Sequence, residues 1–467
     1  MRFKGTYILA SLFAAVGAYV YLYEVKGKAE REKSEEAEKK VYSFTADEVT
    51  RFYLRNYEDA YRFERGPTGW EIMEPLETRG DDDQIDLILT SLENARIERD
   101  VVDSAADLAP YGLDHPQVAV QIETDQAAYD TLYLGNHNPT QSFIYSRLSG
   151  SNRIFLLPVT VYNNSNKKLH ALRDKTVLAF EKDDVRRVAL VREDDALVFE
   201  KEGERWWITE PIKSRGDRGK IERIINNLSS LKAKDFASEG DKDLAEFALD
   251  DPWGRVDLYL GENVEMKSLL FGRAKGSGDL FAMDAARKPV FVIPTAIATQ
   301  VKEDLQAFRD KKVVDFERSD CREVRLLYPE KRITCEKSPE EEWSYYLGED
   351  PVRHPAREER ITRLLSDIYN LQIVDFVGER GASVEPYGLD RPQVKVEIRG
   401  ESDLLGAFSV GKRSTERVEG EEKSYLYAMN EEDDWIYTIP GNSLDKLLLD
   451  EHELEESEDG ELARGAE

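Results

Sequence analysis

Apolar and polar residues follow two different periods along this chain, and each period recurs three times. Apolar residues with helical spacing begin at Ile85, Ile221 and Ile361. Each begins the same stripe, with apolar residues at offsets of 0, 3, 4, 7 and 10, which is one face of an amphipathic helix. The three stripes are Ile85, Ile88, Leu89, Leu92 and Ala95; Ile221, Ile224, Ile225, Leu228 and Leu231; and Ile361, Leu364, Leu365, Ile368 and Leu371. Asp81 and Asp217 precede two of them and are expected to cap the helices.

An alternation with a period of two follows each helix and predicts strands. The alternating residues are Val118, Val120 and Ile122; Val256, Leu258 and Leu260; and Val394, Val396 and Ile398. Further short strands are expected before each helix and after each alternating segment. Because consecutive short strands with few crossover helices favour antiparallel pairing, we predict α+β domains that are mainly antiparallel, with one amphipathic helix each.

The spacing of shared phrases shows that these domains are tandem copies. Trp70 and Trp206 lie 136 residues apart, and Trp343 follows after 137. The phrases "ALRDKTV" at 171–177 and "AFRDKKV" at 307–313 are also 136 residues apart. We therefore predict three copies of one fold that superpose on one another. They are expected at residues 43–174, 179–310 and 315–450.

The same five-residue turn sequence occurs twice in the chain. "PYGLD" occupies 110–114 and 386–390, and "FALDD" stands at the same place in the middle copy. We expect Gly112 and Gly388 to adopt a left-handed backbone after a short helix. Ala248 would find that conformation costly, so the middle turn is expected to differ locally. The predicted turn residues, with a structural role, are Tyr111, Gly112, Leu113 and Asp114, and Tyr387, Gly388, Leu389 and Asp390.

The N-terminal segment predicts a membrane anchor. Residues 5–23 run 19 residues without a charge, and a helix of that length spans about 28 Å, enough for a bilayer core. A cleaved signal peptide is the alternative, because "VGA" at 16–18 resembles a cleavage site, although the apolar run continues beyond it. Basic residues flank both ends, so they do not decide the orientation. A single-pass anchor at 1–23, with the bulk of the chain extracytoplasmic, is the expectation.

Small residues recur within this anchor. Ala10, Ala14 and Ala18 stand four residues apart and would form a face suited to close helix packing. The alternative is that a membrane helix merely tolerates small residues, and it explains the spacing equally well. Residues 24–42 are expected to form a charged stalk, and residues 451–467 an acidic disordered tail.

These features together resemble the bacterial family called domain of unknown function 4340. The resemblance rests on the anchor, the W-x-I-x-E-P strand, the Asp-led helix, YGLD-x-P and a later LG strand, in three copies over nearly the whole chain. Such motifs are structural and indicate a fold rather than an activity. Members of the family are typically anchored in the bacterial inner membrane and encoded beside ABC-type export or gliding-motility-like transporter genes. The resemblance thus implies a periplasmic accessory subunit whose partners are envelope or ABC-type transporter subunits.

The charge of the chain argues against nucleic-acid partners. Asp and Glu number 94 against 65 Lys and Arg, which leaves a formal net charge of −29. A surface of that sign repels phosphate backbones. Otherwise the acidity indicates a soluble surface without a specific partner.

No motif in the sequence predicts catalysis, a cofactor or a metal. The five histidines lack metal-site spacing. "DDDQID" at 81–86 lacks the glycine and glutamate of an EF-hand, and "RGD" at 79–81 and 215–217 recurs before two helices, so capping and turn roles explain both. Three Ser-x-x-Lys matches lack their companion motifs. They are Ser165/Lys168, Ser229/Lys232 and Ser443/Lys446. Trp70 and Trp206 are expected in the core rather than on a sugar platform.

The two cysteines, Cys321 and Cys335, stand where the other copies have apolar residues. Their counterparts are Val49 and Phe63 in the first copy, and Val185 and Phe199 in the second. Both are therefore expected on the buried face of a hairpin. In an oxidising compartment a disulfide becomes favourable if the Cα atoms approach to about 4.4–6.8 Å. In a reducing compartment both would remain core thiols.

Two functions from different classes remain. The first is a non-catalytic structural or interaction protein of the envelope. The alternative is a ligand-binding or hydrolytic envelope protein that uses a cleft between domains. That alternative requires polar residues that are unique to one copy and that converge in space.

Overall fold

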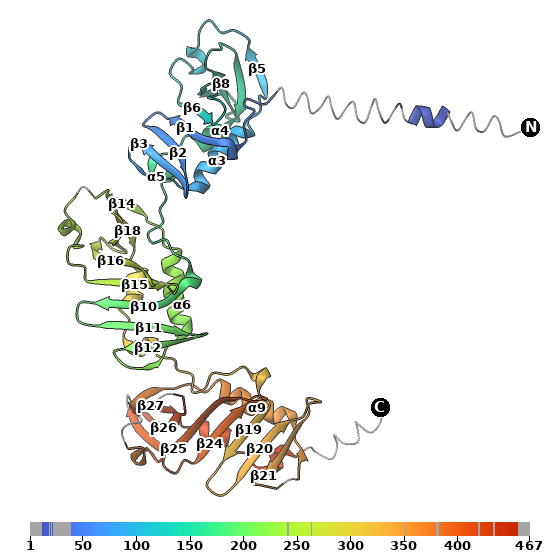
Figure 1. Cartoon of the computed structure of the whole chain (residues 1–467), viewed down its shortest axis with the longest axis vertical. Coiled ribbons are helices and arrows are strands. Elements are labelled where there is room, and N and C mark those ends of the chain that lie inside the picture. Colours follow the sequence, from blue (N-terminus) through green and yellow to red (C-terminus); the bar gives the residue numbers. More distant parts are fainter. Residues whose placement is uncertain are drawn as a thin grey trace, which may run out of the picture. The chain divides into compact units, whose positions relative to one another are not determined.

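The computed structural model describes residues 12–17, 19, 21 and 39–455, except 241, 263, 351, 380–382, 419–420 and 433–434. Three nine-stranded sheets form its folded domains (Figure 1). Every strand pairing in the described residues is antiparallel. The chain divides into two compact units, Met1–Thr176 with the first sheet and Val177–Glu467 with the other two. The predicted strand-rich, mainly antiparallel fold is confirmed.

Domain 1 covers residues 39–176, and its sheet has the order β4-β3-β2-β1-β6-β7-β8-β9-β5. Its strands are β1 (Val49–Arg55), β2 (Ala60–Gly66), β3 (Gly69–Glu74), β4 (Thr78–Arg79), β5 (Arg99–Val102), β6 (Val118–Thr124), β7 (Leu132–His137), β8 (Phe143–Leu148) and β9 (Ile154–Pro158). Its helices are α3 (Asp82–Glu93), α4 (Val159–Ser165) and α5 (Leu169–Leu172), with the 3-10 helices η2 (Ala46–Glu48) and η3 (Ala109–Tyr111).

Domain 2 covers residues 177–312 and repeats this order as β13-β12-β11-β10-β15-β16-β17-β18-β14. Its strands are β10 (Val185–Arg192), β11 (Ala196–Glu202), β12 (Arg205–Glu210), β13 (Ser214–Arg215), β14 (Asp235–Ser238), β15 (Gly254–Leu260), β16 (Glu265–Lys275), β17 (Asp279–Asp284) and β18 (Val290–Pro294). Its helices are α6 (Arg218–Ser229), α7 (Ala296–Val301) and α8 (Leu305–Phe308), with η4 (Lys182–Asp184) and η5 (Leu244–Phe247).

Domain 3 covers residues 313–455, with the order β22-β21-β20-β19-β24-β25-β26-β27-β23. Its strands are β19 (Glu323–Leu327), β20 (Arg332–Lys337), β21 (Trp343–Leu347), β22 (His354–Pro355), β23 (Asp375–Glu379), β24 (Val394–Arg399), β25 (Leu404–Val418), β26 (Glu421–Asn430) and β27 (Trp435–Pro440). Its helices are α9 (Glu358–Tyr369), α10 (Ser443–Leu447) and α11 (Glu451–Leu454), with η6 (Arg318–Asp320) and η7 (Glu385–Tyr387).

The three predicted amphipathic helices are α3, α6 and α9. In each, the four apolar residues of the stripe that fall within the helix are buried. Asp81 and Asp217 cap α3 and α6 as expected, because each carboxylate accepts a hydrogen bond from a backbone N–H in the first turn. Two short helices accompany the long one in every domain. Each domain therefore has more helices than the one amphipathic helix and the short closing helix that the sequence predicts.

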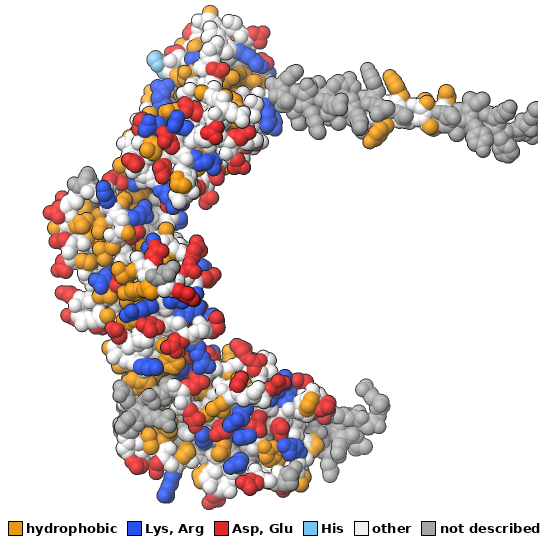
Figure 2. All heavy atoms as spheres, viewed as in Figure 1, with side chains coloured by type: hydrophobic (Ala, Val, Ile, Leu, Met, Phe, Trp, Pro, Cys, Tyr) orange, Lys and Arg blue, Asp and Glu red, His pale blue; other side chains and the backbone are white. Residues whose placement is uncertain are grey.

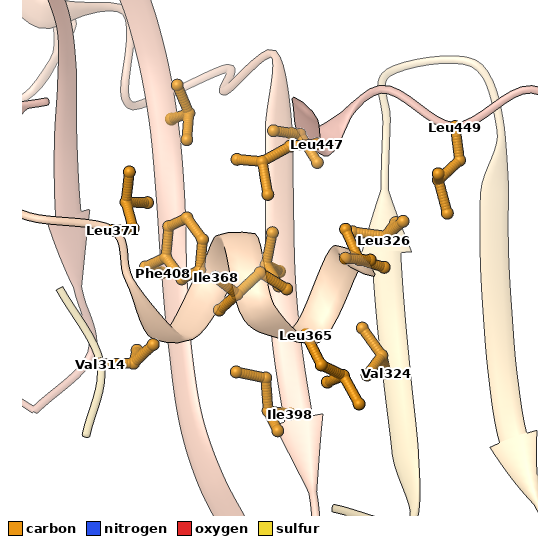
Figure 3. Close-up of a cluster of buried hydrophobic side chains, with 14 of the residues drawn as sticks. Val314, Val324, Leu326, Leu365, Ile368, Leu371, Ile398, Phe408, Leu447 and Leu449 are labelled. Atoms are coloured by element: carbon orange, nitrogen blue, oxygen red, sulfur yellow. The ribbon is translucent and has the colours of Figure 1, made fainter. Parts of the chain in front are cut away.

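The main core of each domain lies between the long helix and one face of the sheet. Figure 3 shows this in domain 3, where Leu365 and Ile368 of α9 point toward Ile398 and Phe408 of the sheet. Equivalent clusters form the cores of domains 1 and 2. Trp70 and Trp206 are buried in these cores, so the prediction of a packing role is confirmed.

Both edges of every sheet are protected against further pairing. At one edge the strand is only two residues long, as in β4, β13 and β22. At the other edge a register shift interrupts the pairing of β5, β14 and β23. Short and bulged edge strands are the usual way in which sheets avoid aggregation. Each sheet is thus protected at both edges from pairing with another strand.

Each domain extends beyond its predicted boundaries. Tyr42 was assigned to the stalk, but it is buried in the core of domain 1 and donates a hydrogen bond from its hydroxyl to the Asp130 carbonyl oxygen at 2.8 Å. Apolar residues between the predicted copies are buried in the core of the following domain. Leu454 was assigned to the disordered tail but is fully buried in domain 3, so the tail prediction was wrong for residues 451–455.

Most of the predicted anchor lies outside the described residues. Ala14 is described and exposed, whereas Ala10 and Ala18 lie outside the described part, as do residues 24–38 of the stalk and 456–467 of the tail. Among the residues that the structure describes, no helix is long and apolar enough to cross a membrane.

Candidate functional site

The repeated turn packs on the face of the sheet opposite the long helix. In domain 1, Leu113 is buried with Ala105 and Ile154, and Tyr111 packs against this cluster. Gly112 has φ 66° and ψ 23°, and Gly388 has φ 68° and ψ 27°, so both are left-handed as predicted. Asp114 is exposed. The motif therefore covers the second face of the sheet with apolar side chains, which is a structural role rather than a reactive one.

The turn of the middle copy has the same conformation as the others. Ala248 has φ 53° and ψ 46°, in the left-handed region, so the prediction that this turn would differ was wrong. The backbone N–H of Leu249 donates to the Leu244 carbonyl oxygen at 3.1 Å, the bond that Leu113 makes with Leu108. Burial of Leu249 with Phe247 outweighs the cost of an alanine in this region.

A glycine on the neighbouring strand lets each turn approach the sheet. A Cβ atom on Gly135, Gly272 or Gly411 would lie less than 3.0 Å from the carbonyl oxygen of a turn residue. These oxygens belong to Tyr111, Phe247 and Tyr387, respectively. Backbone oxygens cannot move aside like the end of a long side chain. The turn and the glycine thus form one structural latch, which explains why the motif recurs.

A recess of about 490 Å³ lies where domain 2 meets domain 3, both within the second compact unit. The β12–β13 hairpin and the start of α6 supply Trp207, Arg215 and Arg218. The segment that leads into domain 3 supplies Asp310 and Lys312. Trp207 is half-buried, and its neighbour Trp206 is buried in the core. Charged side chains and the two tryptophans thus line the recess together.

Carboxylates accompany the cations of this recess. Arg215 Nη1 lies 3.6 Å from Asp310 Oδ2, and both side chains are largely buried. Burial raises the pKa of Asp310, while the Arg215 guanidinium opposes that rise. Arg218 Nε lies 2.8 Å from Glu222 Oε1, and Lys312 Nζ lies 2.7 Å from Asp315 Oδ1. The recess therefore presents mixed charge, as does the visible surface in Figure 2.

Two arginines of the recess are unique to domain 2. Arg205 stands where domain 1 has Gly69 and domain 3 has Glu342. Arg218 stands where the other domains have Asp82 and Glu358. Side chains of both arginines line the same recess. This is the convergence of copy-specific polar residues that a cleft function requires.

The other chemical motifs have structural roles in this fold. Both RGD sequences form the turn between a two-residue strand and the N-cap of a helix. Ser165 is buried, whereas Lys168 pairs with Glu58 at 2.9 Å, so this Ser-x-x-Lys match does not form a reactive pair. Among the described residues, no group of three or more His, Cys, Asp or Glu side chains is arranged to hold a metal ion.

Both cysteine side chains are buried in the core of domain 3. Val324, rather than Cys321, is the register partner of Cys335 on the neighbouring strand. Cys321 lies before β19, and its Sγ lies 3.7 Å from the Glu323 carbonyl oxygen, a weak hydrogen-bond contact. Burial raises the pKa of each thiol to about 12. The disulfide remains to be tested by counting thiols.

Comparison with known proteins identifies a family but no activity. A family model described as "Domain of unknown function (DUF4340)" matches residues 70–237, 206–392 and 353–457. No curated protein matches the chain.

Two solved sliding clamps are only remotely similar to this chain. The DNA polymerase III subunit beta from Pseudomonas aeruginosa is 8% identical over 84% of this chain and 93% of its own, with a TM-score of 0.17. The corresponding clamp from Bartonella birtlesii is 6% identical over 85% of this chain and 93% of its own, with a TM-score of 0.13. Scores of this size carry no argument about fold or function.

Proposed function

This chain belongs to the DUF4340 family, and from that premise we propose that it is a non-catalytic interaction protein of the bacterial envelope. It is anchored in the inner membrane by its N-terminal segment, with three domains in the periplasm. There it acts as an accessory subunit of an ABC-type or gliding-motility-like transport complex. The family match supports the tandem domains, and the sequence resemblance supports the anchor and the partner class.

The observation that carries this proposal is the triplication of a self-contained domain. Each copy has a sheet of the same order, a core of its own and two protected edges. Repeating such a domain multiplies surface, because every copy buries its apolar residues internally. A series of stable surfaces suits a protein that positions other proteins.

Affinity purification from membranes tests this function. The full chain, tagged at its C-terminus, is expected in the membrane fraction, and mild detergent extraction should co-purify subunits of one transporter. A matched control replaces residues 1–23 by a cleavable signal peptide, which releases the three domains into the periplasm. Loss of the co-purified subunits with the released form supports anchored assembly. Recovery of the full chain alone, after crosslinking before extraction, would contradict the proposal.

A second candidate function rests on the recess of domain 2. Arg205 and Arg218 are specific to that copy, and Trp207 offers a half-buried ring beside them. Mixed charges beside an aromatic wall suit a small polar ligand. Native mass spectrometry of the chain purified from membranes tests this candidate. A bound small molecule that disappears in Arg205→Ala/Arg218→Ala but persists in Arg287→Ala would favour it.

A further inference from the structure

A buried arginine joins domain 2 to domain 3. Arg309 follows α8 at the end of domain 2 and is 1% exposed. Its Cζ atom lies 3.2 Å from the ring centroid of Phe376 and 4.0 Å from that of Trp435, both in domain 3. Its Nε donates a hydrogen bond to Ser214 Oγ of domain 2 at 3.1 Å. One guanidinium therefore contacts elements of both domains.

Polar contacts near this guanidinium also connect domain 2 to domain 3. The indole Nε1 of Trp435 donates to the Lys213 carbonyl oxygen at 2.9 Å. Arg205 Nη1 lies 3.0 Å from Glu432 Oε2. A cation placed on aromatic rings gains most when water is excluded, and here the guanidinium is buried. Bonds from both sides of the junction therefore surround the stacked arginine.

The arginine occurs in the domains that another domain follows in the sequence. Arg173 takes the place of Arg309 in domain 1 and is also buried. In domain 3 the corresponding residue is Glu455, since Gly80, Gly216 and Ala356 form equivalent bridges with Arg173, Arg309 and Glu455. The last copy thus has a carboxylate at this position.

The residues at the positions of Phe376 and Trp435, which contact the arginine, also differ between the domains. The strand register places Asp100 of domain 1 at the position of Phe376 in domain 3. Arg153 stands at the position of Trp435, one residue before the matched pair of Ile154 and Ile436. Arg153 binds the Asp100 carboxylate with two hydrogen bonds, of 2.7 and 2.9 Å. Domain 1 therefore carries an ion pair where domain 3 carries two aromatic rings, and domain 2 has Phe236 and Pro289 at these positions.

We infer that Arg309, Phe376 and Trp435 form a directional junction that fixes domain 3 on domain 2, and that charged residues stand at the equivalent receiving positions of domain 1 and at the equivalent arginine position of domain 3. Arg309 is the positioning residue, and Phe376 and Trp435 receive it. This inference goes beyond the proposed function, because it concerns how the chain holds its own domains and requires no partner.

Limited proteolysis of the full chain tests the junction. Trypsin cuts after Lys311 and Lys312, but neighbouring backbone groups are held by bonds from Asp310 to Arg215 and from Ile373 to Lys311. Cleavage there requires the junction to open. Arg309 is itself a trypsin site that Arg309→Ala removes, so the rate is compared at Lys311 and Lys312 alone. Arg309→Ala should increase the cleavage rate after these two lysines about tenfold or more, given the strength of a buried cation–π contact. Arg309→Lys should also increase it, since a lysine keeps the charge but loses the planar stacking.

Two controls separate an open junction from an unfolded domain. Arg287→Ala removes a guanidinium from the Phe291 ring inside domain 2 and should leave linker cleavage unchanged. In chain whose cysteines are reduced beforehand, Cys321 and Cys335 should stay protected from thiol reagents in Arg309→Ala, which shows that domain 3 remains folded. Trp435→Leu, a second variant on the receiving side, should open the linker as Arg309→Ala does.

Linker cleavage at the wild-type rate in both Arg309→Ala and Trp435→Leu would overturn the inference. Faster cleavage accompanied by exposure of both thiols would also overturn it, because it would assign these residues to the stability of domain 3. Neither result depends on whether a transporter co-purifies, so this test and that of the proposed function can fail independently.

Discussion

A Cβ atom added to Gly135 of β7 would lie less than 3.0 Å from the carbonyl oxygen of Tyr111 in the repeated turn. This approach joins the turn to the strand in each domain, with Gly272 and Gly411 in the other copies. Gly135→Ala should lower the free energy of unfolding of domain 1 by about 1–3 kcal/mol, because backbone must move to admit the methyl group. Chemical denaturation, followed by hydrogen exchange of β7, measures the loss.

Gly219→Ala is the matched control for that substitution. A Cβ at this position meets its nearest neighbour, Asp217 Oδ1, at an ordinary 3.4 Å, and the residue lies exposed in the first turn of α6. Alanine favours a helix over glycine, so this variant should be unchanged or more stable by up to about 1 kcal/mol. Equal losses from both variants would show that the latch contributes nothing specific.

The left-handed alanine of domain 2 predicts a stabilising substitution. Ala248→Gly should raise the free energy of unfolding of domain 2 by about 0.5–1 kcal/mol, because glycine adopts this conformation without a steric penalty. Gly388→Ala, at the same position of domain 3, should lower the stability of that domain by about 1 kcal/mol. Changes of opposite sign in the free energy of unfolding, measured by thermal or denaturant unfolding, would confirm that the two turns share one conformation. A destabilised Ala248→Gly would contradict it.

The buried thiols predict a loss of stability at alkaline pH. Their pKa of about 12 in the folded domain exceeds the ordinary value of 9.0. The folded state therefore holds more protons than the unfolded state between these values, and its stability should fall as pH rises from about 9 to about 12. The double variant Cys321→Val/Cys335→Val should lose less stability than the wild type between pH about 9 and about 12. Because Tyr328 also has a raised pKa and remains in both proteins, only the difference between them is diagnostic.

Counting thiols tests the state of the same cysteines. The register places Val324 opposite Cys335, so we expect two free thiols in chain that is denatured without reductant after isolation from the native envelope. Folded protein should react slowly with the same reagent, since both side chains are buried. The absence of reactive thiols until reductant is added would establish the disulfide instead.

The small-residue face of the anchor predicts a separable effect on assembly. Ala14→Leu/Ala18→Leu should reduce co-purification of partner subunits while membrane insertion persists, because larger side chains prevent close helix packing. Val16→Leu, on another face of the same helix, is the control. Undiminished co-purification in the double variant would show that the alanines are merely tolerated.

The repeat, the long helices and their caps could be predicted because each leaves a periodic or local signature. Ile85 and its equivalents mark a helical face, and Asp81 can cap a helix whatever lies elsewhere in the fold. The conformation of Ala248 could not be predicted in the same way. Local preference disfavours it, and the burial of Leu249, which decides it, depends on a sheet formed by distant residues.

The junction residues were missed for a related reason. The phrase that contains Arg309 marks the repeat, and its arginine recurs at Arg173, but neither fact indicates a contact with another domain. Phe376 and Trp435, which receive Arg309, lie 67 and 126 residues further along the chain. Only the folded sheet brings them to one guanidinium. Comparing which copies keep the arginine was the signal available in the sequence.

Crosslinking mass spectrometry in intact cells measures most directly whether these three domains contact an integral membrane partner. We predict crosslinks from lysines of the three domains to periplasmic segments of one transporter, and their loss when residues 1–23 are replaced by a cleavable signal peptide. Abundant crosslinks within the chain, with none from its domains to any membrane protein, would contradict the account.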